Sequence, residues 1–132
     1  MNNIAKIILT IATLVYGIGP LVADMNTSHV LHPDWTPHAR FHMVWLLTIT
    51  SAVAIISLWL IWIRSQPIIA AMLGLCVVGG FWIAVATRQI YNGALNDPGG
   101  IETKILGFNE NAFSLGIVTA FLLIGLVMCD RK

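Results

Sequence analysis

Charged side chains are scarce in this chain of 132 residues, because Asp, Glu, Lys and Arg together make up only 10% of it. A soluble domain carries roughly 25% charged residues. The seven basic residues are scattered and the formal net charge is +1, so the sequence lacks the basic patch with which proteins neutralise nucleic-acid phosphates. These shortages exclude an ordinary soluble domain, and we expect no nucleic-acid partner.

Cysteine is also nearly absent. Cys76 lies in the middle of one apolar stretch and Cys129 at the end of another. A disulfide needs two Cα atoms within about 7 Å of each other, and the different depths of these residues prevent that. We therefore expect neither a disulfide framework nor a cysteine-based metal site.

Apolar residues, in contrast, are abundant and make up 58% of the chain. Uninterrupted apolar runs of about 18 or more residues are typical of membrane-spanning helices. The sequence contains four predicted spans, at about residues 4–23, 41–63, 67–91 and 110–128. They leave no room for a separate soluble domain. The predicted fold is all-α: a polytopic membrane protein in which residues 1–132 form one antiparallel four-transmembrane-helix bundle in the lipid bilayer.

An even number of spans places both termini on one side of the membrane. Basic residues flank both sides: Lys6, Arg64, Arg131 and Lys132 on the side of the termini, and Arg40, Arg88 and Lys104 on the other. Because cytoplasmic ends carry the excess of Lys and Arg, we expect both termini in the cytoplasm, in a plasma or inner membrane. Tryptophans are typical of membrane interfaces, and we expect them to mark both: Trp35 and Trp45 the outer one, Trp59 and Trp62 the inner one.

All the histidines lie together between the first two spans, within a stretch of fourteen residues: His29, His32, His38 and His42. Imidazole is the side chain best suited to bind a transition metal or to move a proton near neutral pH. Thr36 and Pro37 predict a helix start just before His38. His38 and His42 are then four residues apart on one helix face, a spacing that supplies two ligands in helical metal sites.

The other two histidines precede this helix in a connection that can fold back on it. The sequence therefore predicts that three or four imidazoles converge on one metal ion, with His29, His32, His38 and His42 as ligands. Asp24 or Asp34 would be a further ligand or a hydrogen-bond acceptor behind the ligands. A set of nitrogens with at most one carboxylate suits Zn, Cu or Fe.

Further polar residues lie at the same predicted height in the bundle. Arg88 ends the third span and Glu110 begins the fourth. Ionisable groups at this depth are costly unless they pair or line a cavity. Glu110 or Asp24 is therefore a candidate acid or base, and Arg88 is a candidate for holding an anion or pairing with Glu110. Alternatively, Arg88 extends to the interface and Glu110 only complements the helix dipole.

The run His29-x2-His32-Pro-x-Trp35-x-Pro37-His38-Ala-Arg40-Phe-His42-x2-Trp45 resembles one found in small four-span membrane proteins of uncharacterised function. The resemblance covers mainly residues 24–45 and implies a fold and a candidate site, but no activity. The His38-x3-His42 pair also looks like one histidine box of the membrane desaturases and hydroxylases. The further boxes that would hold a di-iron centre are missing, so that activity is not implied.

Several functions remain open at this point. The leading hypothesis is a metal-binding, outward-facing polar pocket that acts on a lipid or another apolar substrate. In the main alternative, the chain is a non-catalytic accessory subunit of a larger membrane complex or a homo-oligomer, and the imidazoles only form hydrogen bonds. A transporter ranks last, because the central turns of the second to fourth spans contain none of the ionisable residues that transport pathways use.

Overall fold

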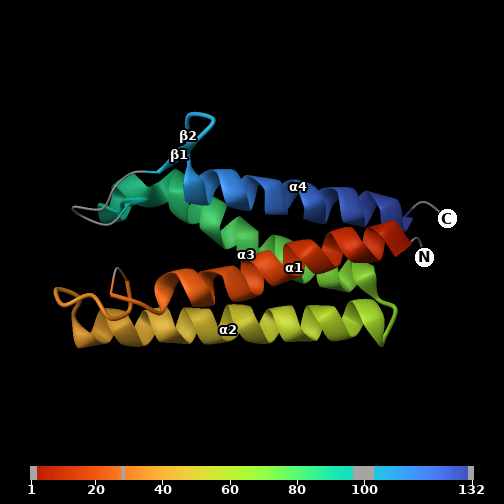
Figure 1. Cartoon of the computed structure of the whole chain (residues 1–132), viewed down its shortest axis with the longest axis horizontal. Helices are drawn as coiled ribbons and strands as arrows, with labels where there is room; N and C mark the ends of the chain where they lie inside the picture. Colours follow the sequence, from red (N-terminus) through yellow and green to blue (C-terminus); the bar gives the residue numbers. More distant parts are fainter. Residues whose placement is uncertain (1–2, 28, 97–102, 131–132) are drawn as a thin grey trace.

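The computed structural model of the protein describes residues 3–27, 29–96 and 103–130, and these residues form an antiparallel helical bundle (Figure 1). The long helices are α1 (Asn3–Asp24), α2 (Pro37–Trp62), α3 (Pro67–Thr87) and α4 (Glu110–Asp130). A 3-10 helix, η1 (Arg88–Tyr91), continues α3. The predicted all-α fold with four antiparallel spans is confirmed.

Within the described ranges, each of the four long helices is long and apolar enough to cross a bilayer. The chain is therefore a multi-pass membrane protein. The start of α1, the end of α4 and the short α2–α3 turn lie together at one end, which we call the terminal end (Figure 1). The opposite end, here called the histidine end, holds residues 25–27 and 29–36, and residues 92–96 that follow η1.

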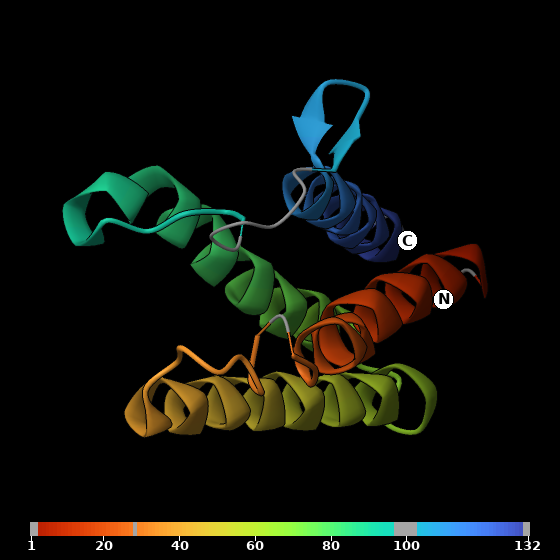
Figure 2. The same cartoon turned by 60° about the vertical axis from the view of Figure 1, so that its left-hand side comes forward.

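The helices pack so that α1 and α3 each contact both α2 and α4, and α1 also contacts α3. Among the described residues α2 and α4 do not touch, so they occupy opposite corners of the bundle. Near the histidine end, α2 and the η1 end of α3 splay apart, as both Figure 1 and Figure 2 show. This separates the start of α2 from the start of α4.

The predicted start of the second helix is confirmed in detail. Thr36 is the N-cap, and its hydroxyl oxygen accepts a hydrogen bond of 3.2 Å from the Ala39 N–H. Pro37 occupies the first helical position, where its missing N–H is not needed. Local sequence therefore fixes where His38 and His42 lie along α2.

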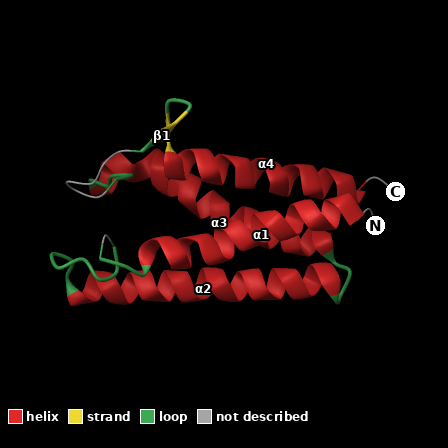
Figure 3. Cartoon of the chain, viewed as in Figure 1, coloured by secondary structure: helices red, strands yellow, loops and turns green. Residues whose placement is uncertain are grey.

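Two local features differ from the expected pattern. The third span ends as a 3-10 turn rather than an α-helix, closed by Asn92 in the left-handed region at φ 56°. A small hairpin precedes α4, with β1 (Lys104–Ile105) paired to β2 (Phe108–Asn109) (Figure 3). Its turn residues Leu106 and Gly107 have φ of 52° and 86°, as in the two-residue turns that favour tight hairpins.

The terminal end is bordered by cation–aromatic contacts. The Lys6 ammonium lies 5.2 Å from the Trp62 ring centroid, and the Arg64 guanidinium lies 5.3 Å from that of Trp59. The Trp62 indole N–H also donates a 3.0 Å hydrogen bond to the Thr10 hydroxyl. Tryptophan with a neighbouring cation is typical of a membrane–water boundary. Arg131 and Lys132, which we also expect at this end, lie outside the described residues.

A buried hydrogen bond joins α1 to α2 in the middle of the bundle. The Tyr16 hydroxyl donates to the Ser57 hydroxyl oxygen over 3.0 Å, and the two residues are only 1% and 0% exposed. Replacing Tyr16 by phenylalanine leaves the Ser57 hydroxyl without this partner. We expect the free energy of unfolding to fall by about 1 kcal/mol, measured by denaturant titration in detergent.

The control for this prediction is Thr10→Val, which removes the exposed hydrogen bond to Trp62. We expect it to change stability less than Tyr16→Phe, because an exposed donor finds other partners. Ser57→Ala should lower stability to a similar extent as Tyr16→Phe, and the double variant should add little. Full additivity of the two substitutions would contradict a direct bond between these hydroxyls.

Candidate functional site

His38 and His42 form a close pair on the first turns of α2. Their Nε2 atoms lie 3.0 Å apart, and the two rings are nearly perpendicular, at 88°. The His42 ring stacks on Trp45 with 5.8 Å between centroids and 28° between planes. Both histidines are exposed. The spacing of four residues thus brings two nitrogens together, as predicted for this pair.

His29 and His32 belong to the segment that connects α1 to α2. The His29 Nε2 atom lies 3.8 Å from Asp24 Oδ1, and its ring faces Trp35 edge-on with 6.2 Å between centroids. The His32 Nδ1 atom accepts a 3.2 Å hydrogen bond from the Asp34 N–H. Asp24 is therefore a neighbour of His29, and the backbone of Asp34 is a neighbour of His32.

Arg40 fixes the side of α2 on which this segment lies. Its Nη2 atom donates to the carbonyl oxygens of His32 and Pro33, over 2.7 Å and 3.4 Å. Arg40 is two residues from His38 and two from His42, and therefore lies about 160° around the helix from each. The connecting segment covers the Arg40 side, whereas His38 and His42 point away from it.

The predicted convergence of all four imidazoles is accordingly not seen. Within residues 3–27, 29–96 and 103–130, no group of three or more His, Cys, Asp or Glu side chains is placed to hold a metal ion. The physical reason is that Arg40 holds the connecting segment on one side of α2, whereas His38 and His42 point to the other side. The structure brings together His38 with His42, and Asp24 with His29, as two separate pairs.

Arg88 and Glu110 lie on the other side of the histidine end, at η1 and at the start of α4. Arg88 Nη1 donates a 3.0 Å hydrogen bond to the Val85 carbonyl, and the Glu110 N–H donates one of 3.1 Å to the Thr103 carbonyl. Among the described residues no ion pair joins Arg88 to Glu110, so this predicted pair is not formed. Glu110 is exposed in the first turn of α4, where its charge complements the helix dipole.

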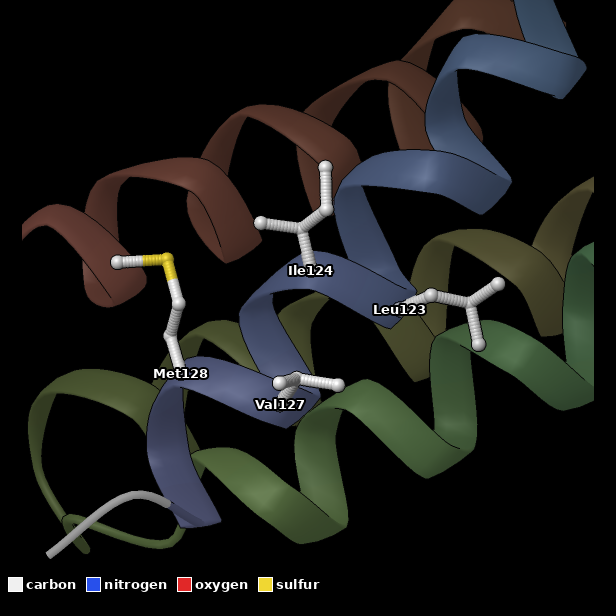
Figure 4. Close-up of a pocket in the computed structure, with 4 residues that line it drawn as sticks. All are labelled: Leu123, Ile124, Val127 and Met128. Carbon is white, nitrogen blue, oxygen red and sulfur yellow. The ribbon is translucent and has the colours of Figure 1, made fainter.

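Two shallow hollows lie elsewhere on the surface. One, on the outer side of α4, is apolar (Figure 4) and is lined by Leu123, Ile124, Val127 and Met128. It offers a lipid chain contact area but no polar group to orient a ligand. The other lies where α3, η1 and α4 meet, and is lined by Phe81, Ala84, Val85, Arg88, Tyr91, Ala94, Leu95 and Asn111. Neither hollow includes a histidine.

Sequence reasoning missed the aromatic surroundings of the histidine pair. Phe41 and Trp45 flank His42, with centroid distances of 5.8 Å for each. The spacing of three residues between His42 and Trp45 could have indicated this stacking, because such residues share a helix face. The role of Arg40 as the anchor of the connecting segment had no comparable local indication.

A model described as a family of unknown function (DUF6640) matches residues 8–126, which include all four histidines and most of each long helix. No curated protein and no solved structure matches the chain. Because the family model covers most of the sequence, the chain belongs to the DUF6640 family, whose function is unknown.

Proposed function

We propose that this membrane protein binds a transition-metal ion at the histidine end, through the Nε2 atoms of His38 and His42. The observation that supports this most directly is the 3.0 Å distance between those two atoms. Two nitrogens that each lie 2.0–2.1 Å from a tetrahedral zinc ion are about 3.3 Å apart. Small rotations of the two rings would therefore bring both lone pairs onto one ion.

The chemistry of the donors suits zinc, copper or iron, since imidazole is a preferred ligand of all three. In the absence of a metal, one Nε2 must act as donor and the other as acceptor, which requires different tautomers in the two rings. A metal ion removes that requirement because it accepts lone pairs from both. Asp24 lies beside His29, whereas Arg88 and Glu110 lie at η1 and at the start of α4. These three residues therefore take no part in the proposed metal binding.

The position of the pair supports access from both the bilayer and water. His38 and His42 are exposed on the first turns of α2, and Trp45 lies beside them, as is typical of an interface. A lipid or another apolar molecule could thus reach the metal sideways from the bilayer. By the positive-inside rule, we place this end outside the cytoplasm and the terminal end inside.

The test is metal analysis of protein purified in detergent, stripped with a chelator and reloaded with Zn²⁺, Cu²⁺ or Co²⁺. We expect the native chain to hold at least one ion per two chains. The double variant His38→Ala/His42→Ala should lose the ion. The matched control, His29→Ala/His32→Ala, should retain it. A native protein that holds less than one ion per two chains would refute the proposal.

A further inference from the structure

The histidine pair supplies only half of a metal coordination shell. Zinc sites in proteins are four-coordinate, with three or four protein ligands. In the described part of the chain, no third His, Cys, Asp or Glu side chain joins His38 and His42. The contacts of Arg40 with the His32 and Pro33 carbonyls hold the connecting segment on the opposite side of α2. The described residues thus leave this coordination shell incomplete, and a partner chain with further imidazoles would complete it.

The helix face that presents this pair is exposed along its whole length. Positions on it recur at alternating spacings of four and three residues, and we call this set the outer stripe: His38, His42, Trp45, Ile49, Ala52, Ile56 and Trp59. Every member is exposed, and within the described residues α2 packs only on α1 and α3. A repeat of seven residues is the one by which two helices pack side by side.

Apolar residues on such a face are equally stable against lipid, so the repeat by itself would not indicate a partner. The two imidazoles at its end differ from these apolar residues. Polar groups that face away from their own bundle at a membrane boundary are stabilised when they find polar partners. A cation shared with another chain would provide them. The exposed repeat and the missing metal ligands thus both indicate that a partner binds this face of α2.

Copies of a membrane protein insert with the same orientation, which constrains how two of them can pair. A twofold axis along the membrane normal makes the two α2 helices parallel and puts identical residues at identical depth. His38 and His42 of one copy then face His38 and His42 of the other across the axis. Four imidazole nitrogens meet there, which is the number that a tetrahedral ion requires.

We propose that a second copy of this chain completes the site: two copies pack through their outer stripes and hold one transition-metal ion between four imidazoles. This inference rests on the proposed metal binding at His38 and His42. Trp45, stacked on His42, and Phe41 lie next to the ion on each copy. These exposed rings add apolar contact between the copies.

The experiment measures mass and metal content together, by light scattering and elemental analysis of the full chain in detergent with Zn²⁺. We expect a dimer with one zinc ion per two chains.

Ala52→Trp keeps all the imidazoles but places a bulky ring in the middle of the outer stripe. It should convert the dimer to a monomer and weaken zinc binding at least tenfold. The matched control is Ala120→Trp, at an exposed position of α4, which does not touch α2; it should leave both properties unchanged.

The outcomes separate this inference from the proposed function. One zinc ion per chain on a monomer, or unchanged zinc affinity in Ala52→Trp, would overturn the shared site and leave metal binding by the pair intact. A native chain that binds none of Zn²⁺, Cu²⁺ and Co²⁺ would overturn both. Isolation of the chain at fixed stoichiometry with a different membrane protein, in place of the dimer, would overturn the choice of a second copy as the partner.

Discussion

Leucine in place of Gly17 is expected to lower the free energy of unfolding by about 3 kcal/mol or more, because it forces α1 and α2 apart. A Cβ atom at Gly17 would collide with the Cβ of Ala54 and lie 3.6 Å from its Cα. The Ala54 Cβ is attached directly to the helix backbone, so it cannot move aside. Overpacking of such contacts costs about 1–3 kcal/mol and sometimes more, and leucine adds three further carbons. Thermal unfolding in detergent measures the loss.

Gly19 provides the matched control in the same helix. A Cβ atom there meets nothing within 4 Å, so Gly19→Leu should leave stability unchanged or raise it slightly, since glycine is a weak helix former. The Ser51 hydroxyl donates a 3.1 Å hydrogen bond to the Gly17 carbonyl, which indicates the same close approach of the helices. Equal effects of the two leucine substitutions would show that α1 and α2 do not touch at Gly17.

Alanine in place of His42 is expected to weaken metal binding about 100-fold or more. Structural zinc sites with four ligands have apparent binding free energies of about 10–16 kcal/mol, or about 3 kcal/mol per ligand. One lost ligand corresponds to about a 100-fold change in affinity, and where two copies share the ion both lose His42, so the change is larger still. His42 is exposed, so the helix content by circular dichroism should not change. Competition with a chromophoric chelator measures the affinity.

His32→Ala is the control, because it removes the same side chain from the same end of the bundle. We expect it to leave metal affinity unchanged, since His32 lies with the connecting segment on the Arg40 side of α2. If both substitutions weakened binding equally, His32 would bind the ion together with His42, as in the convergent cluster that the sequence alone suggested. The comparison thus decides between the local pair and the convergent cluster.

The parts of this structure that depend on local sequence could be predicted. The four spans follow from uninterrupted apolar runs, and the start of α2 follows from Thr36 and Pro37. The His38–His42 pair follows from their spacing on a helix. Each of these inferences uses residues that are close in sequence, and each is confirmed.

The relation between the connecting segment and α2 could not be predicted in the same way. The hydrophobic pattern of the sequence does not indicate on which side of α2 the connecting segment lies. That choice depends on Arg40 and the carbonyls of His32 and Pro33, a contact between residues seven and eight apart. Arg88 lies in η1, and Glu110 directly follows the β1–β2 hairpin. The sequence pattern did not indicate either of these short elements.

The cation–aromatic contacts at the terminal end also define a vertical scale for the whole molecule. Trp62, beside Lys6, marks one edge of the hydrocarbon. His42 is twenty residues earlier on the same helix, a rise of about 30 Å, which equals the thickness of the hydrocarbon layer. His38 then lies about 6 Å farther out, among the headgroups. An ion at the proposed site would thus exchange with the surrounding medium without any opening of the bundle.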